Sequence, residues 1–187
     1  MDVSTNDLKN GMTLELEGSL WTLVEFQHVK PGKGHAFVRT KLKNVQSRAV
    51  VERTFRADEK VGLAIVSRKE MQFLYREGDH LVVMDTGSYE QMHVPLDVVG
   101  VAADYLIEGA MAMVTTHEGR ALGVELPAAV TLTVAETDPG VKGDRVSGAM
   151  KPARLETGLR VQVPLFVELG DRIKVDTRTG EYLTREQ

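Results

Sequence analysis

The sequence of 187 residues contains no cysteine, a single tryptophan and only 5% aromatic residues. The absence of cysteine excludes a disulfide framework, a catalytic thiol and a thiolate metal site, so the fold depends on packing alone. No apolar run approaches the roughly 18 to 20 residues that span a bilayer. The first residues, MDVSTND, lack the basic and apolar regions of a secretory signal. We therefore expect a cytoplasmic protein that is not associated with a membrane.

The residue types that carry catalysis are present but are not grouped. The five histidines show no metal-binding spacing, and most carboxylates fall in turns, where they favour turn and cap geometry. The segment PGKG at residues 31–34 has neither the Walker spacing nor a following helix, which argues against a nucleotide site. The sequence therefore predicts no catalytic residue, no metal and no cofactor.

Short apolar and β-branched runs recur along almost the whole chain, separated by turns that contain glycine. This pattern is typical of a mostly β protein. We expect strands at residues 12–16, 20–30, 35–43, 48–54, 72–76, 80–84, 110–116, 130–136, 159–163, 173–176 and 182–184. One segment, 97–108, has helical periodicity, with apolar residues at i, i+3, i+4, i+7 and i+8 and Gly109 as its C-cap.

The number and spacing of the strands favour small β-barrels over one large sandwich. Two joints are predicted, at residues 62–67 and at residues 125–128, where Pro127 interrupts a strand pattern. Dividing the chain there gives three domains, 1–64, 65–126 and 127–187, each close to the lower size limit for an independent core. We therefore expect packing between neighbouring barrels to contribute to stability.

The formal net charge of −4 conceals an uneven distribution. Residues 1–64 carry a net charge of +2, residues 65–126 carry −6, and residues 127–187 are neutral. Within the first segment, residues 30–56 contain eight basic residues and one acidic residue. Such a block on adjacent strands is typical of a surface that binds phosphates. Lysines that protect an exposed edge strand from aggregation are the alternative explanation.

Residues 31–34 connect two of the longest predicted strands, so we expect them to form the tip of a long hairpin. Pro31 presets φ, and Gly32 and Gly34 allow the chain to reverse. Lys33 then lies at the apex between two residues without side chains, and its ammonium group projects far from the barrel. An ordinary solvated turn lysine is equally compatible with this position.

Several motifs occur in an order that has a parallel in a known family. The hairpin reads FQHVKPGKGHAFVRTKLK at residues 26–43 and is followed by VERTFR at 51–56. The last third contains TDPGVKGD (137–144), KPARLETG (151–158), VPLFV (163–167), GD (170–171) and VDTRTGEYLTR (175–185). Together these motifs resemble the functional hairpin, the end of the first domain and the C-terminal signature of the bacterial elongation factor P family.

This resemblance implies an L-shaped factor similar in outline to tRNA, with an SH3-like barrel of the KOW type followed by two OB-type barrels. It also implies a non-enzymatic, monomeric elongation factor. Such a factor binds both ribosomal subunits beside P-site peptidyl-tRNA and relieves stalling at consecutive prolines. Lys33 would reach toward the CCA end of the tRNA. The residues expected to contact tRNA or rRNA are Lys30, Arg39, Lys41, Lys43, Arg53, Tyr182 and Arg185.

Two further points come from the resemblance. The tip residue of many members is lengthened by covalent modification, so Lys33 is a candidate substrate of a lysine-modifying enzyme. The loop between residues 143 and 151 often carries a Gly-Thr-Gly-Gly sequence that approaches the exit-site codon, whereas this chain has Ser147-Gly148-Ala149-Met150. Tyr182 and Arg185 match the C-terminal pattern, and are equally compatible with a strand-packing tyrosine and a solvated arginine.

Three other interpretations predict different features. The hypusine-containing initiation factor of eukaryotes and archaea resembles this chain in its lysine-tipped hairpin but has only two domains, and residues 127–187 argue against it. A general single-strand binder built from OB barrels needs aromatic platforms, and aromatic residues are scarce here. A Schiff-base enzyme needs its lysine in a pocket that depresses the lysine pKa, and a hairpin apex offers no pocket.

Overall fold

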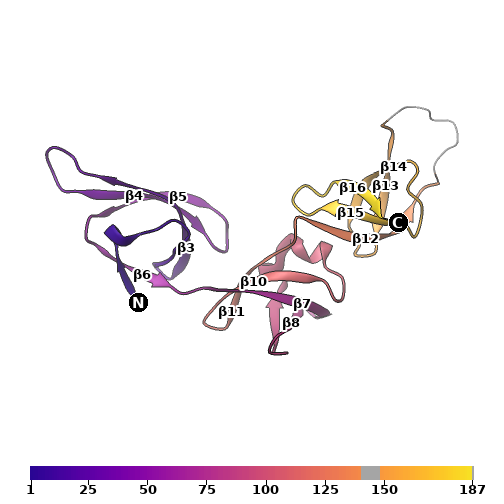
Figure 1. Cartoon of the computed structure of the whole chain (residues 1–187), viewed down its shortest axis with the longest axis horizontal. Helices are drawn as coiled ribbons and strands as arrows, with labels where there is room; N and C mark the ends of the chain where they lie inside the picture. Colours follow the sequence, from indigo (N-terminus) through magenta and orange to yellow (C-terminus); the bar gives the residue numbers. More distant parts are fainter. Residues whose placement is uncertain (140–147, 187) are drawn as a thin grey trace. The chain divides into compact units, whose positions relative to one another are not determined.

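The structure of the chain is a computed structural model, described for residues 1–139 and 148–186. It divides into two compact units, one formed by Met1–Arg68 with Thr115–Gly123 and the other by Lys69–Val114 with Val124–Gln187. The strands form three curled sheets that follow one another along the chain (Figure 1). The mostly β class predicted from the sequence is therefore confirmed. In the described residues, no helix is long and apolar enough to cross a membrane.

The first sheet has six strands in the order β1-β6-β2-β3-β4-β5. Their bounds are β1 Asp2–Ser4, β2 Thr13–Leu16, β3 Ser19–Val29, β4 Phe37–Asn44, β5 Val50–Arg56 and β6 Lys60–Ala64, with a short 3-10 helix, η1, at Thr5–Asp7. Side chains alternate along β4, so Val38, Thr40 and Leu42 are buried. Val38 and Leu42 belong to the core of this sheet, which also contains Leu14, Leu23 and Phe55. This core anchors the long β3–β4 hairpin.

The second sheet has five strands in the order β11-β10-β7-β8-β9. Their bounds are β7 Ser67–Glu77, β8 His80–Asp85, β9 Gln91–Pro95, β10 Met111–His117 and β11 Arg120–Glu125. Val82 of β8, Val94 of β9 and Val114 of β10 are completely buried. The turn between β10 and β11 is formed by Glu118 and Gly119, both with positive φ, as a tight hairpin requires.

The third sheet also has five strands, in the order β14-β13-β12-β15-β16. Their bounds are β12 Ala129–Thr137, β13 Met150–Leu155, β14 Arg160–Pro164, β15 Arg172–Asp176 and β16 Tyr182–Glu186. Its inward side chains form one apolar cluster that includes Leu132, Leu155, Val163, Ile173 and Val175. Alternating burial along β13, β14 and β15 supplies most of these side chains.

The helical segment is shorter than predicted. The periodicity predicts one helix over residues 97–108, whereas the α-helix α1 covers only Leu96–Val99 and continues as a 3-10 helix, η2, at Gly100–Tyr105. Gly100 interrupts the α-helix because its φ is +60°. The predicted C-cap is also wrong, because the Gly109 amide donates to the Phe73 carbonyl of β7 at 2.8 Å and so extends the sheet.

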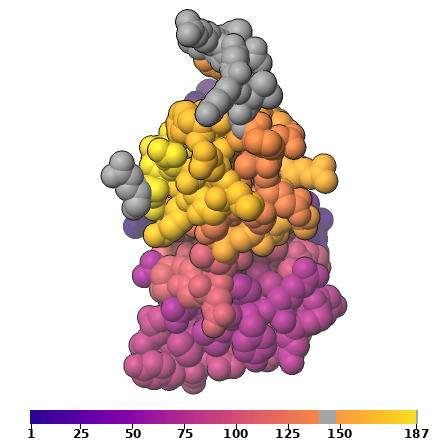
Figure 2. All heavy atoms as spheres, turned by 90° about the vertical axis from the view of Figure 1, so that its right-hand side faces the viewer, coloured from indigo at the N-terminus to yellow at the C-terminus, as the bar shows by residue number. Residues whose placement is uncertain are grey.

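Tyr105 connects the second sheet with the third inside one compact unit. It lies at the end of η2, is buried, and belongs to the apolar cluster of the third sheet together with Leu132 and Ile173. A Cβ atom at Gly180 would lie 3.3 Å from the Tyr105 hydroxyl, so this hydroxyl group lies against the turn before β16. In Figure 2 the orange and yellow residues of the third sheet lie against pink residues of the second.

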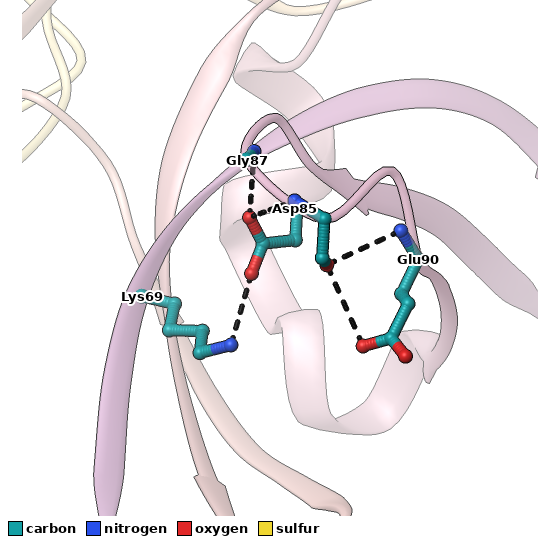
Figure 3. Close-up of polar contacts among 5 residues, drawn as sticks. Lys69, Asp85, Gly87 and Glu90 are labelled. Carbon is teal, nitrogen blue, oxygen red and sulfur yellow. Dashed lines mark hydrogen bonds and ion pairs between the residues drawn. The ribbon is translucent and has the colours of Figure 1, made fainter.

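The turn between β8 and β9 is organised by the carboxylate of Asp85 (Figure 3). One carboxylate oxygen accepts hydrogen bonds from the amides of Gly87 at 2.8 Å and Ser88 at 3.3 Å. The other accepts a hydrogen bond from the Lys69 ammonium group of β7 at 2.9 Å. The hydrogen bond from Lys69, followed by those from the two amides, lowers the pKa of Asp85 to about 2.

The lowered pKa of Asp85 predicts that the stability of the protein depends on pH. Because the pKa of Asp85 is lowered on folding, its stabilising contribution is complete above the ordinary aspartate pKa of 3.8 and is lost as the pH falls through about 2. We expect Asp85→Asn to lower the melting temperature at pH 7, and the difference from wild type to shrink below about pH 3. The measurement is thermal unfolding against pH. The exposed Asp104→Asn is the control, and a pH-independent difference for Asp85→Asn would contradict this assignment.

Candidate nucleic-acid interface

The β3–β4 hairpin presents Lys33 at its end. The last paired residues are Val29 and Phe37, which leaves residues 30–36 as a loop with Lys33 at its centre. Lys30, Pro31 and Lys33 are all exposed, and the loop projects beyond the sheet in Figure 1. Among the described residues, Lys33 has no hydrogen-bond or ion-pair partner. Its ammonium group is therefore available for contact with another molecule.

The two glycines beside Lys33 differ in conformation. Gly34 has a φ of +110°, which only glycine adopts without strain, so it makes the reversal of the chain. Gly32 does not have a positive φ, and a Cβ atom there would meet nothing within 4 Å. Of the two glycines expected to allow the reversal, Gly34 is the one with a positive φ. The lack of a side chain at Gly32 leaves one flank of Lys33 open.

One face of the sheet carries a row of basic side chains from β4. Arg39, Lys41 and Lys43 alternate with the buried residues of this strand and therefore share its outer face. In the register of the sheet, Lys41 lies between Glu25 of β3 and Glu52 of β5. The two carboxylates offset the charge of Lys41.

Arg39 has neutral neighbours in the sheet register, so its positive charge is offset less than that of Lys41. Arg39 lies between Gln27 of β3 and Thr54 of β5. A groove of about 130 Å³ lies over the same strands, and its lining includes Gln27, Arg39 and Lys41 together with the acidic residues Glu25 and Glu52. A polyanion on this face would therefore meet an uncompensated guanidinium group at Arg39.

Arg53 lies on the opposite face of the sheet. It is paired in register with the buried Thr40, so its side chain leaves β5 on the core side. Its guanidinium group donates to Glu17 at 2.9 Å and lies 5.4 Å from the centre of the Phe55 ring. The structure therefore groups Arg39, Lys41 and Lys43, and separates Arg53 from them.

The two predicted contact residues of the last strand have different environments. Tyr182 is partly buried and packs against the core of the third sheet. The Arg185 guanidinium group contacts the Asp171 carboxylate at 3.3 Å and lies 5.2 Å from the centre of the Phe166 ring. The pKa of Asp171 is lowered, first by the hydrogen bond from the Glu168 amide and also by Arg185. Arg185 is thus held in place at the surface, whereas Tyr182 packs against the core with part of its side chain exposed.

Sequence reasoning did not single out Phe166 as a site residue. It is 57% exposed although aromatic, and it supports the Arg185 guanidinium group. Phe166 lies in the motif VPLFV just after the end of β14, and a strand pattern cannot show that an apolar residue beyond the strand is exposed.

Ser147 of the predicted loop lies outside the described residues. Gly148 has a φ of +91°, and Met150 begins β13.

The geometry of the described residues is that of a binding surface. No group of three or more His, Asp or Glu side chains in the described part of the chain is placed to hold a metal ion. The hairpin combines an exposed amine, a fixed reversal and a cationic face. These features can position a polyanion by charge and shape.

Comparisons with known proteins agree along the whole chain. The family models "Elongation factor P (EF-P) KOW-like domain", "Elongation factor P (EF-P) OB domain" and "Elongation factor P, C-terminal" match residues 4–61, 66–124 and 130–185. Elongation factor P of Acidothermus cellulolyticus is 62% identical over 182 residues, and that of Streptomyces coelicolor is 60% identical over 183 residues. Each alignment covers 97% of both chains.

A solved structure shows the same fold at lower identity. Translation initiation factor 5A from Methanococcus jannaschii aligns with a TM-score of 0.54 and 24% identity, over 65% of this chain and 90% of that chain. The family models and the two curated relatives carry the assignment to a family of translation factors, which are not enzymes. This chain belongs to the elongation factor P family.

Proposed function

We propose that this protein binds the ribosome beside P-site peptidyl-tRNA and promotes peptide-bond formation at consecutive prolines. One observation carries the proposal: Lys33 is the central, exposed and unpartnered residue of a loop on a long hairpin within the described chain. In this proposal Lys33 reaches the CCA end of the tRNA. The outer face of β4, with Arg39, lies against phosphates of the acceptor arm.

The chemistry of proline explains why such a factor needs no catalytic group. The proline ring fixes φ, so a growing chain that ends in prolines is restricted in how it can align for attack. Holding the tRNA end in a reactive geometry accelerates the reaction by orientation, without an acid, a base or a nucleophile from the factor. The lysine acts by position and charge, and the ribosome performs the reaction.

Lys33 is also our candidate for covalent modification. Its amine is exposed and its neighbours Gly32 and Gly34 offer no side chain that would block an enzyme. A longer side chain would extend the reach of the hairpin. Intact and peptide mass spectrometry of the protein from its native cell tests this directly: added mass on Lys33 supports modification, and an unaltered lysine contradicts it.

Translation of a polyproline template in vitro tests the proposed function. Adding the matured protein to ribosomes of its own cell is expected to increase full-length product from a template with consecutive proline codons. The control template carries alanine codons at the same positions and should respond little. An equal response of both templates would contradict the proposed role, and so would no response of either.

Charge reversal on the outer face of β4 tests the predicted phosphate contacts. We expect Arg39→Glu to weaken ribosome binding and to reduce the slope of log affinity against log salt by about 1 for each lost phosphate contact. Lys41→Glu should act less strongly, because Glu25 and Glu52 flank Lys41 in the sheet register. Lys60→Glu, at an exposed position on β6, is the control. A salt slope that none of these changes alters would rule out this face.

A further inference from the structure

Two arginines lie directly opposite each other on the third sheet. Arg154 of β13 and Arg160 of β14 are paired in the antiparallel register, and both are exposed. They precede and follow the tight turn in which the Leu155 amide donates to the Leu159 carbonyl at 2.8 Å. The pair next to a hydrogen-bonded pair is a non-hydrogen-bonded one, where facing side chains are closest. Like charges in this arrangement destabilise a sheet.

One of the two cations is neutralised and the other is not. Arg154 is also paired in register with Glu136 of β12, and its guanidinium group contacts the Glu136 carboxylate at 3.1 Å. Arg160 has no ion-pair or hydrogen-bond partner among residues 1–139 and 148–186. The row Glu136–Arg154–Arg160 thus ends in an uncompensated guanidinium group on β14, an edge strand of the sheet.

A groove of about 280 Å³ lies over this row. Its lining includes Glu136, Thr137, Asp138, Arg154 and Arg160. Asp138 follows the end of β12, so β13 separates it from Arg160. The groove is therefore acidic on its β12 side and basic on its β14 side.

We propose that Arg160, together with Arg154, binds a backbone phosphate of ribosomal RNA in this groove; this inference rests on the proposed ribosome binding. A guanidinium group presents two parallel donors that match phosphate oxygens. A phosphate between the two arginines would replace their mutual repulsion by attraction to both. The site is separate from the hairpin that carries Lys33 and from Arg185, which contacts Asp171.

The proposal predicts opposite effects of one substitution on stability and on binding. Arg160→Gln removes the repulsion between the facing arginines, so its melting temperature should equal or exceed that of wild type. The same variant should bind ribosomes more weakly, with a salt slope reduced by about 1. Arg172→Gln is the matched control, because Arg172 is exposed on β15 of the same sheet and makes an ion pair with Glu186 at 3.9 Å.

The first measurement is ribosome affinity as a function of salt concentration for wild type, Arg160→Gln and Arg172→Gln. The second is the melting temperature of the same proteins in inorganic phosphate and in chloride at matched ionic strength.

Weaker binding and a lower salt slope for Arg160→Gln alone support the proposal. Wild-type binding by Arg160→Gln overturns it and leaves the proposed function intact. If phosphate stabilises wild type more than Arg160→Gln while ribosome affinity is unchanged, the site takes a free anion and the RNA assignment is wrong. If wild type fails to bind ribosomes, the proposed function fails, and the inference fails with it.

Discussion

Lys33→Ala is expected to abolish the stimulation of polyproline synthesis while leaving the fold intact. Losing an orienting group at a reacting centre can cost on the order of 100-fold in rate. Lys33 has no partner in the described chain, so its removal breaks no interaction of the folded state. Surface substitutions of this kind change stability by about 0.5 kcal/mol or less. The measurements are the yield of full-length polyproline product and the melting temperature of the variant.

Lys33→Arg separates the positive charge from the primary amine, and Lys9→Ala is a control for position. Lys33→Arg keeps a cation on a stem of similar length but removes the primary amine, so full activity would assign the effect to charge alone. Lys9→Ala, at another exposed lysine of the same unit, should retain activity. A fall of several degrees in the melting temperature of Lys33→Ala would show that the side chain supports the fold, and would overturn its assignment as a free tip.

Tyr105→Ala should destabilise the protein more than any surface change considered above. Tyr105 is 8% exposed and belongs to the core of the third sheet although it lies before β10 in the chain. Truncating a large buried aromatic side chain typically costs about 3–5 kcal/mol, because the lost contacts leave a cavity. For a chain of this size we expect the melting temperature to fall by roughly 10 °C. The measurement is thermal or denaturant unfolding.

The control for this prediction is Tyr105→Phe, which keeps the ring and removes only the hydroxyl group beside Gly180. It should cost about 1 kcal/mol or less. Equal effects of the two variants would mean that the hydroxyl group, and not the packing of the ring, holds the two sheets together. A small effect of Tyr105→Ala would mean that the third sheet folds without this contact.

The hairpin could be predicted because its signals are local. Strands expected at 20–30 and 35–43 correspond to β3 at Ser19–Val29 and β4 at Phe37–Asn44. Alternating apolar residues and the turn sequence around Lys33 lie within one short stretch of chain. The arrangement of the basic side chains depends instead on the pairing between strands. The β4–β5 register pairs Arg39 with Thr54 and Arg53 with Thr40, so Arg39 and Arg53 occupy opposite faces, although sequence reasoning grouped them.

The elements that were missed have weak or misleading patterns. The helical periodicity at 97–108 assigned Val101 to an apolar face, yet Val101 is 77% exposed. β13 was not predicted, because it contains Pro152 and has a lysine at an inward position. Lys151 is only 6% exposed, and its ammonium group donates to the Asp138 carbonyl at 2.6 Å. A buried charge of this kind is tolerated only with such a partner, which no strand pattern reveals.

The position of Tyr105 also determines when this chain can finish folding during its own synthesis. Chains emerge from the N-terminus onward, so Tyr105 leaves the ribosome before every strand of the sheet that buries it. Until Ile173 and Val175 follow, the nascent chain displays an unburied aromatic ring, a feature that chaperones recognise and that promotes aggregation. A chain released early, without β15, would lack Ile173 and Val175 from the cluster that covers this ring, so we expect it to aggregate more readily than the full chain.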